Sequence, residues 1–336
     1  VFHPNGPLEK DLKKTGISVF TLNMRSRRDI FHSLRYLIKE VRFQKPDIIH
    51  GYLGGPNILS VILKRFFPSH TRIIWGVRAS NVDLRQYSWL ERLTYFVERI
   101  LSGFADLIIV NSKTGLSHVM KNGFPRDKMV VIHNGIDTER YFIDRSAGGK
   151  IRAEWGIKDC EMLIGLVGRF DPMKDHAVFL KAASLIVRDR KDIRFVCIGD
   201  GTESYRFKLL SLSNALGLDG LMLWAGTRDD MPAVYNAMDI LVSSSAYGEG
   251  FPNVIGEAMA CGVPCVVTDV GDSAYVVSDT GIVVPPRDPE ALAEGMRKLI
   301  DSDLTSLGLK ARQRIVENFN VDQLVSRTED ALKRLC

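Results

Sequence analysis

The residues best suited to chemistry lie in the segment YGEGFPNVIGEAMACGVPCVVTDVGD, residues 247–272. Two glutamates, Glu249 and Glu257, stand eight positions apart in it around a Gly-Phe-Pro turn. Ionised carboxylates accept hydrogen bonds from the hydroxyl groups of a sugar or a ribose. Gly250 permits close approach of a ligand, and Pro252 suits the first turn of a helix, whose N-terminus attracts phosphate. Together these features suggest a pocket for a nucleotide sugar.

Two cations follow an apolar run earlier in the same half of the chain. Arg169 and Lys174 lie five positions apart in GRFDPMKDH, directly after MLIGLV. The planar guanidinium of arginine and the compact ammonium of lysine together suit a diphosphate. Taken alone, this pair of residues favours the simpler interpretation of two solvated surface cations. Their place after a buried strand, with the Glu249 segment in the same half, favours the diphosphate interpretation.

The segment IGDGTES (198–204) partly matches the dinucleotide fingerprint G-x-G-x-x-G, but its last position is Ser204. No acidic residue ends the following strand, so we predict no nicotinamide cofactor and interpret Gly199 and Gly201 as turn glycines.

Thr227 and Arg228 follow another predicted strand, and the backbone of their loop is a candidate for holding a nucleobase edge. Asp229 or Asp230 is expected to cap the next helix, with Pro232 in its first turn.

Two further candidates lie in the first half. His50 ends the predicted strand DIIHGY and Arg78 ends RIIWGV. A lone His or Arg at a strand end is often structural. In open parallel sheets, however, ligands bind beyond the carboxyl ends of the strands, so both side chains are expected to point into a cleft.

Ile- and Val-rich strands alternate with amphipathic helices along the whole chain, which predicts buried parallel sheets. The predicted strands are 47–52, 72–77, 106–112, 129–135, 162–168, 193–199, 221–226, 239–245, 264–269 and 281–286. The predicted helices are 25–45, 55–66, 87–102, 113–122, 175–190, 203–217, 231–238, 253–261 and 288–301. The series fits two doubly wound α/β domains. The expected boundary is YFIDRSAGGK (141–150), where Gly148 and Gly149 would loosen the chain.

Length and composition agree with this organisation. A chain of 336 residues is long enough for two cores, and its 45% hydrophobic and 25% charged residues are typical of a globular protein. Its five cysteines lack zinc spacing, so we interpret them as small buried hydrophobes in a reducing compartment. We find no membrane-spanning run and no signal peptide. The chain starts with Val, and its opening resembles the end of a helix that leads into a strand, so a preceding strand is expected.

Charge is unevenly distributed, with a net +10 in residues 1–145 and −5 in residues 146–336. The segment Arg25 to Lys45 carries much of the excess, and its apolar residues recur at helical spacing. One interpretation is a surface helix with a solvated basic face. The other is a helix that contacts anionic lipid headgroups.

The whole pattern resembles a retaining glycosyltransferase of family 4 (group 1). The similarity covers nearly the entire chain and rests on motifs that are weak singly but specific in this order. These are PDIIHGYLGG, SKTGLSHVMKNGFPRDKMVVIHNGID, VGRFDPMKDH, GDGTES, WAGTRDDMPAVYNAMDILVSSS and EGFPNVIGEAMACGVP.

The resemblance implies the GT-B fold, with two Rossmann-like parallel-sheet domains facing across a cleft. Residues 1–145 would form the acceptor-side domain without its first strand, and residues 146–320 the nucleotide-sugar domain. The helix in 321–336 would cross back to the first domain.

The resemblance also implies roles for individual residues. Arg169 and Lys174, after Gly168, would bind the diphosphate, Glu249 the sugar hydroxyls and Glu257 the ribose. The backbone amides of Gly250, Phe251, Pro252 and Asn253 are the expected contacts to sugar or phosphate, although Pro252 itself has no N–H to donate. Thr227 and Arg228 would lie near the base, and His50 and Arg78 on the acceptor side.

The implied reaction transfers a hexose from a UDP or GDP sugar to a polysaccharide, lipopolysaccharide or lipid-linked acceptor of bacterial type. No metal, no cofactor and no nucleic-acid partner are expected. The location would be cytoplasmic, with peripheral contact at the inner membrane face. One departure stands out, because Arg78 occupies a position where relatives often carry His, and arginine cannot act as a general base. Two alternatives remain, namely a GT-B enzyme of another reaction class (a nucleotide-sugar epimerase or a phosphorylase) and an inactive truncated nucleotide-binding fragment.

Overall fold

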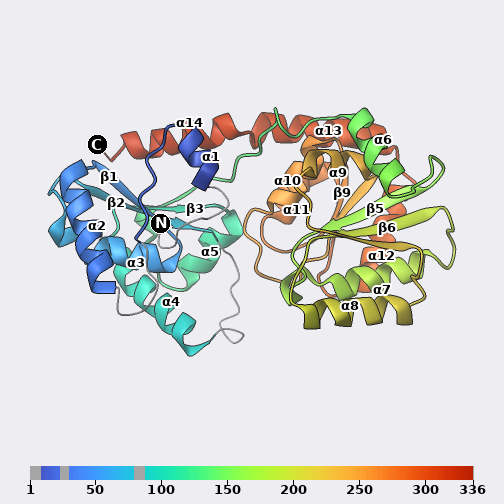
Figure 1. Cartoon of the computed structure of the whole chain (residues 1–336), viewed down its shortest axis with the longest axis horizontal. Helices are drawn as coiled ribbons and strands as arrows, with labels where there is room; N and C mark the ends of the chain where they lie inside the picture. Colours follow the sequence, from blue (N-terminus) through green and yellow to red (C-terminus); the bar gives the residue numbers. More distant parts are fainter. Residues whose placement is uncertain (1–8, 23–29, 79–87, 336) are drawn as a thin grey trace. The chain divides into compact units, whose positions relative to one another are not determined.

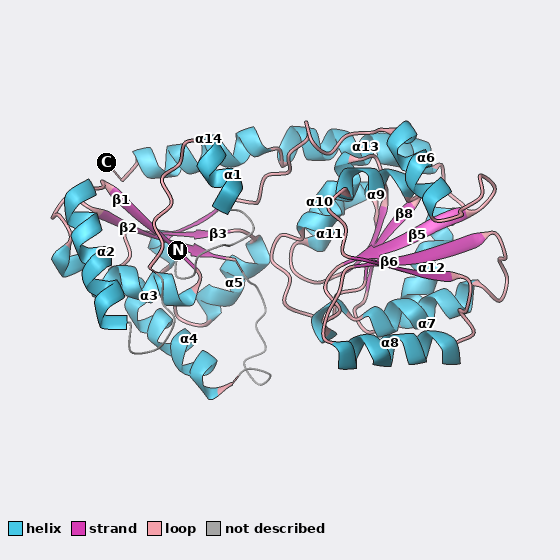
Figure 2. Ribbon diagram, viewed as in Figure 1, coloured by secondary structure: helices cyan, strands magenta, loops and turns pink. Residues whose placement is uncertain are grey.

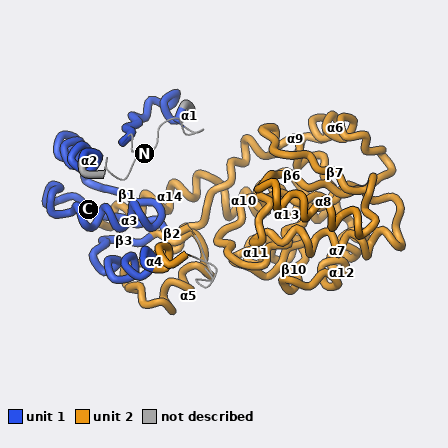
Figure 3. The backbone as a smooth tube through the Cα atoms, turned by 60° about the horizontal axis from the view of Figure 1, so that its bottom comes forward, with its two compact units in different colours: residues 1–76, 93–108 blue, residues 77–92, 109–336 orange. Residues whose placement is uncertain are grey.

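The computed structural model describes residues 9–22, 30–78 and 88–335 (Figure 1). The chain divides into two compact units (Figure 3). Unit 1 comprises residues 1–76 and 93–108, and unit 2 comprises residues 77–92 and 109–336. The domain limits expected from the sequence, 1–145, 146–320 and 321–336, remain a prediction.

A four-stranded sheet has the order β1-β2-β3-β4. Its strands are β1 (Ile48–Tyr52), β2 (Arg72–Val77), β3 (Leu107–Val110) and β4 (Met129–Val131). The first two strands are parallel, with His50 opposite Ile74. The β2 residues Ile73, Ile74 and Trp75 are fully buried, as expected for a parallel strand covered on both faces.

A six-stranded sheet lies in unit 2, with the order β10-β9-β8-β5-β6-β7. Its strands are β5 (Met162–Val167), β6 (Ile193–Ile198), β7 (Met222–Gly226), β8 (Ile240–Ser243), β9 (Cys265–Thr268) and β10 (Ile282–Val284). The strand pairs are parallel. From β5 the chain builds outward through β6 and β7, then returns to β8 on the other side of β5. The strand order therefore reverses between β5 and β8, and such a switch point is where doubly wound sheets bind ligands.

Helices surround both sheets (Figure 2). They are α1 (Glu9–Lys14), α2 (Ile30–Gln44), α3 (Gly54–Ile62), α4 (Trp89–Leu101), α5 (Lys113–Lys121), α6 (Arg145–Glu154), α7 (His176–Ile186), α8 (Glu203–Ala215), α9 (Met231–Ala237), α10 (Asn253–Ala260), α11 (Ser273–Val277), α12 (Pro289–Ile300), α13 (Leu304–Asn318) and α14 (Val321–Lys333). Successive side chains of a strand point to opposite faces. Accordingly Leu163 and Ile164 of β5 join different apolar clusters, one with α9, α10, α11 and α13 and the other with α7, α8 and α12.

Each of the ten strands given by residue range has a counterpart within a few residues, and so has each predicted helix in the part of the chain that the structure describes. The strand expected after the opening helix is not observed, because residues 17–22 beyond α1 form no strand. The sequence reading did not predict α6, α11 and α13. The predicted helix from Arg25 is observed as α2 from Ile30 onward, because residues 25–29 lie outside the described part of the chain. The final helix is observed as α14, within unit 2.

The expectation that Gly148 and Gly149 loosen the chain within residues 141–150 was wrong. This segment does not form a loose connection but leads into α6, whose N-cap Asp144 accepts a hydrogen bond from Ala147 N. Gly148 is buried against α9, where a Cβ would lie 2.2 Å from Asn236 O. Its missing side chain therefore permits close helix packing and does not loosen the chain.

The expected burial of the cysteines is also wrong at one position. Cys197, Cys261 and Cys265 are buried, but Cys160 is exposed, and Cys336 lies outside the described residues. No helix in the described part of the chain is both long and apolar enough to cross a bilayer.

Candidate functional site

The switch point brings together the loops that follow β5 and β8. After β5, the chain forms the short 3-10 helix η6 (Pro172–Lys174), whose N-cap Asp171 accepts a hydrogen bond from Met173 N. Asp175 then adopts φ 45°, and its carboxylate caps α7 by accepting from Val178 N. This strained turn is held by two acidic caps and fixes where Lys174 leaves the backbone.

Lys174 and Glu249 form an ion pair at this point. Lys174 Nζ donates to Glu249 Oε1 over 2.5 Å, and Ser245 Oγ donates to the same oxygen over 2.6 Å. Ser244 Oγ donates to Lys174 O over 2.8 Å, so the loop after β8 also holds the backbone after β5. The Glu249 side chain is only 9% exposed, so this interaction is screened less than a surface pair. A cation and an anion predicted from distant sequence segments are thus brought into contact.

Gly168 makes room for the lysine. A Cβ at this position would meet Lys174 Cγ and Cδ at 3.3 Å, which is tighter than ordinary contact. The loop after β6 also approaches the loop after β5 closely, since a Cβ at Gly199 would lie 2.1 Å from Gly168 O. Arg169, by contrast, is exposed and forms no hydrogen bond or ion pair with the described residues. Its guanidinium is therefore available to an anion in this region.

Helix α10 begins beside the ion pair. Gly248 has φ 79°, a backbone conformation that suits glycine, and Pro252 occupies the N-cap position. No side chain caps α10, so its first N–H groups are left to water or a ligand. Asn253 is exposed at the first helical position, whereas the Phe251 side chain is buried in the core. Only the backbone of Phe251 can therefore face a ligand.

Glu257 lies one turn into the same helix. Tyr235 Oη donates to Glu257 Oε2 over 2.8 Å, which leaves the carboxylate oriented by a buried phenol. Burial raises the pKa of Glu257 above its ordinary 4.5, against the hydrogen bond from Tyr235 and the charge of Arg140, which lower it. A half-buried carboxylate with one fixed partner retains acceptor capacity for further hydroxyl groups.

Arg228 is engaged by acidic neighbours. Its guanidinium donates to Asp230 Oδ1 and Oδ2 at 2.8 and 2.7 Å and to Glu154 Oε1 at 2.6 Å. Asp230 does occupy the N-cap position of α9, but its side chain makes no capping hydrogen bond. The predicted carboxylate cap is therefore wrong, because Asp230 binds Arg228 instead. Thr227 is exposed beside this cluster.

The two first-half candidates fall in different units. Arg78 is exposed in unit 2, where its Nη1 donates to Asn134 Oδ1 over 2.5 Å. Asn134 Nδ2 donates in turn to Asn253 Oδ1 over 2.8 Å, so Arg78 is linked through one side chain to the start of α10. His50 lies in unit 1, stacked on Tyr52 with ring centroids 4.2 Å apart.

Sequence reasoning missed several residues that orient the site. Ser245 and Tyr235 hold the two glutamates, and no pattern in a single sequence marks them for this purpose. Asp272 was seen only as the end of a motif. Its N–H donates to Gly250 O over 2.9 Å, and its carboxylate accepts from Lys113 N over 2.7 Å and from Thr114 N over 2.9 Å. It thereby ties the α10 loop to the start of α5.

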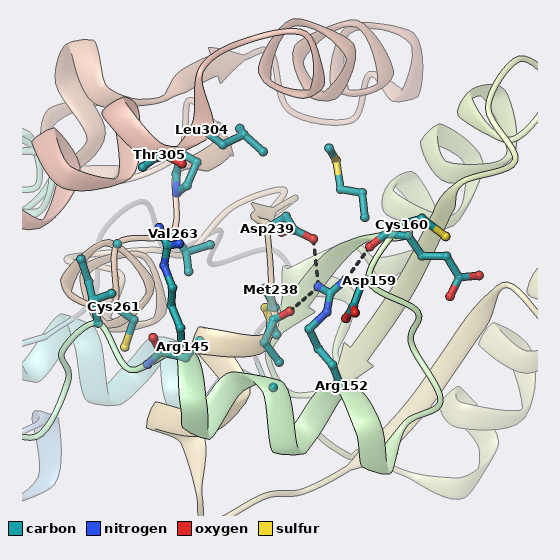
Figure 4. A pocket seen from close by; sticks show the side chains of 18 of the residues that line it. Arg145, Arg152, Asp159, Cys160, Met238, Asp239, Cys261, Val263, Leu304 and Thr305 are labelled. Atoms are coloured by element: carbon teal, nitrogen blue, oxygen red, sulfur yellow. Dashed lines mark hydrogen bonds and ion pairs between the residues drawn. The ribbon is translucent and has the colours of Figure 1, made fainter.

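A cavity of about 610 Å³ lies elsewhere in unit 2, at the amino ends of β5, β8 and β9. Figure 4 shows Arg152 directed at Asp239 inside it. Arg152 Nη1 donates to Asp239 Oδ2 over 3.1 Å and to Ala237 O over 2.9 Å, and Nη2 donates to Glu161 O. The guanidinium of Arg152 is thus already bound by neighbouring protein groups. None of the predicted site residues lines the cavity. Among the described residues, no three His, Cys, Asp or Glu side chains gather in a group that could hold a metal ion.

Comparison with known proteins places this geometry in a family. Residues 1–140 match the sequence profile described as Glycosyltransferase Family 4, and residues 161–302 match that of Glycosyl transferases group 1. The chain is 26% identical over 309 residues to the UDP-Gal:alpha-D-GlcNAc-diphosphoundecaprenol alpha-1,3-galactosyltransferase of Escherichia coli, a match that covers 89% of this chain and 78% of the relative. It is 27% identical over 257 residues to the N-acetylgalactosamine-N,N'-diacetylbacillosaminyl-diphospho-undecaprenol 4-alpha-N-acetylgalactosaminyltransferase of Campylobacter jejuni, covering 75% of this chain and 66% of the relative.

The fold is shared with solved structures as well. The crystal structure of Anabaena Alr3699/HepE in complex with UDP matches with a TM-score of 0.87 at 21% identity, over 98% of this chain and 90% of that chain. The two matched profiles cover most of the chain in consecutive segments. The chain therefore has the GT-B fold and belongs to the group 1 glycosyltransferases of family 4.

Proposed function

We propose that this protein transfers a hexose-type sugar from a nucleoside diphosphate sugar to a glycan or lipid-linked acceptor, with retention of anomeric configuration. The observation that carries the proposal is the Lys174–Glu249 ion pair at the switch point, next to the uncapped start of α10. The two relatives named above are sugar transferases with diphosphoundecaprenol acceptors, which supports a lipid-linked acceptor of similar chemistry.

The positive groups act on the leaving group. Breaking the bond between sugar and phosphate leaves negative charge on the departing nucleoside diphosphate. The exposed Arg169, the Lys174 ammonium and the α10 N–H groups are cationic or positively polarised before the reaction begins. Such preorganised groups stabilise developing charge without reorganisation. We therefore propose that the reaction needs no divalent ion, and that a donor phosphate oxygen receives the acceptor's proton.

The carboxylates act on hydroxyl groups. Glu249 accepts hydrogen bonds from the transferred sugar, and Glu257 from the ribose. Both are already oriented by a hydroxyl donor, Ser245 and Tyr235 respectively, which limits the entropy lost when substrate binds. The backbone near Thr227 holds the base, with Arg228 bracing that loop. His50 and Arg78 serve the acceptor side.

The proposed donor is of UDP or GDP type, and the proposed location is the cytoplasmic face of a membrane. UDP is favoured because the Escherichia coli relative is named as a UDP-Gal transferase and the Anabaena structure contains UDP. The basic exposed residues of α2 supply the contact with anionic headgroups in this proposal.

A thermal-shift panel of nucleoside diphosphates and their sugars provides the first test. A ligand that binds only the folded state raises the melting temperature by mass action. We expect one nucleotide series to stabilise the wild type, and Arg169→Ala to weaken this effect. Arg188→Ala, which removes an exposed arginine from beyond the end of α7, is the matched control.

Turnover decides between reaction classes. Donor hydrolysis or transfer is expected to fall roughly 100-fold or more in Arg169→Ala and to vanish in Glu249→Ala. Unchanged turnover in both variants would exclude the proposal. Incubation of donor without acceptor tests the epimerase alternative. Under that condition a transferase can only hydrolyse the donor, whereas an epimerase changes the configuration of the sugar. Rates that survive a chelator support the absence of a required metal, and nucleotide binding without any turnover favours the non-catalytic alternative.

A further inference from the structure

Helix α4 carries large apolar side chains on the side that faces solvent. Trp89, Leu93, Phe96 and Ile100 follow at spacings of three and four residues and so lie along one side of the helix. Their exposed fractions are 70%, 49%, 53% and 55%. We refer to these four residues as the α4 stripe. Single exposed apolar residues are normal, but four in line on one helix form a patch that indicates a partner.

The inner side of α4 is, by comparison, only partly apolar. It includes the buried Glu98, which accepts a hydrogen bond from Asn57 Nδ2 of α3 over 2.8 Å. Gly54 at the start of α3 permits this approach, because a Cβ there would lie 3.2 Å from Glu98 Oε2. A surface helix ordinarily buries its apolar side and exposes its polar one. Here a carboxyl group lies inside while tryptophan and phenylalanine lie outside, which suits a helix whose outer side meets an apolar medium.

Cations accompany the stripe in the same region. Arg99 is exposed next to Ile100 on α4, and α2 exposes Arg35, Lys39 and Arg42. Arg42 Nε donates to Phe66 O, just beyond α3, over 3.0 Å. Contacts thus connect α2 to the α3 segment and α3 to α4. Aromatic and aliphatic residues flanked by Arg and Lys are the composition of helices that lie in a membrane interface.

We propose that the α4 stripe inserts into the interfacial region of an anionic bilayer, while the cations of α2 and α4 face the lipid phosphates. The helix then lies in the plane of the membrane surface. A short apolar patch and a weak basic field each bind membranes marginally, and together they give stable attachment. This attachment does not depend on the proposed sugar transfer. It also reassigns the apolar part of the membrane contact from the α2 region to α4.

Vesicle binding tests the proposal directly. The probes are vesicles of phosphatidylcholine alone and of phosphatidylcholine with phosphatidylglycerol, assayed by co-sedimentation and by tryptophan emission. Of the four tryptophans in the chain, Trp89 is the one in the stripe and is 70% exposed, so insertion of the stripe shifts emission to the blue mainly through Trp89. The variant Leu93→Ser/Phe96→Ser/Ile100→Ser is expected to bind anionic vesicles roughly tenfold or more weakly, because buried apolar area drives interfacial binding. Phe207→Ser on α8, which removes a side chain that is 71% exposed, is the control and should bind like the wild type.

Each further result either supports or overturns the proposal. Arg35→Gln/Lys39→Gln/Arg42→Gln should weaken binding and flatten its dependence on salt. Equal binding to both vesicle types, no binding to either, or full binding by the triple serine variant would overturn it. So would a vesicle-free dimer that the serine variant converts to monomer, since the stripe would then be an interface between copies. Nucleotide thermal shifts of the serine variant should equal those of the wild type, which separates this test from that of the proposed reaction.

Discussion

Lys174 Nζ lies 2.5 Å from Glu249 Oε1, although 75 residues separate them in the sequence. The β5 loop carries the cation and the β8 loop the anion, and the reversal of strand order makes these loops neighbours. In the structure, each group satisfies the other. In the proposed function, substrate phosphate and sugar hydroxyls share or replace this contact, which would couple diphosphate binding to sugar binding.

The ion pair should be visible in stability as well as activity. Lys174→Met leaves the Glu249 carboxylate buried with only Ser245 as a partner, so we expect the melting temperature to fall by about 5–10 °C. Glu249→Gln in the Lys174→Met background should recover part of the loss, because the unpaired charge is removed. Differential scanning fluorimetry of the singles, the double and the exposed control Lys310→Met measures this coupling. Strictly additive effects would show that the pair is not formed in solution.

Arg228 should act through the loop that it braces. Because its guanidinium is already bound to Glu154 and Asp230, Arg228→Ala is expected to raise the donor KM by a few-fold with little change in kcat. Steady-state kinetics with varied donor separates this pattern from that of Arg169→Ala, which should lower kcat/KM roughly 100-fold. A loss in kcat as large as that of Arg169→Ala would instead place Arg228 against the reacting phosphates.

Adjacent glycines in α6 should respond in opposite directions. A Cβ at Gly149 meets nothing within 4 Å, so Gly149→Ala is expected to stabilise the helix by about 0.5–1 kcal/mol. Gly148→Ala would place its methyl group 2.2 Å from Asn236 O and should cost about 1–3 kcal/mol. Denaturant unfolding of both variants compares them with the wild type. If both alanines stabilise, α6 does not pack on α9 as observed.

His176 makes stability depend on acidity. It is fully buried, and burial, reinforced by the charge of Lys174, lowers the pKa of His176 to about 4. The unfolded chain binds a proton here as the pH falls through about 6.5, whereas the folded chain does so only near 4. The contribution of His176 to the free energy of unfolding is therefore fully present above pH 6.5. It is lost as the pH falls toward 4, by roughly 2–4 kcal/mol for this group.

His176→Leu should remove that part of the acid sensitivity. Melting temperatures measured between pH 7.5 and 4 are expected to decline less steeply in His176→Leu than in the wild type. His70→Leu, which changes an exposed histidine, is the control and should follow the wild-type curve. Parallel curves for all three proteins would contradict the assignment.

The alternation of apolar strands and amphipathic helices was sufficient to predict the elements of both sheets. Strand β2 was predicted at its observed limits, because RIIWGV is a short, nearly continuous apolar run of the kind that forms a buried parallel strand. The helix predicted over 253–261 is observed as α10, Asn253–Ala260, and Gly262 just beyond it has φ 75°. The family followed from the order of the motifs. Helix α6 was missed because two glycines indicate flexibility in a sequence, and only packing against α9 shows that one of them permits a close contact.

Sequence alone determined which residues could bind phosphate and hydroxyl groups, since charge and hydrogen-bonding capacity belong to the side chain itself. The sequence could not show which of those groups are free to bind a ligand and which are already bound to other residues. Only the tertiary structure shows that Arg169 is open to solvent while Arg228 is held by two carboxylates, and that Ser245 and Tyr235 orient the glutamates. Availability depends on distances between segments far apart in the chain, and those distances are set by strand order and helix packing.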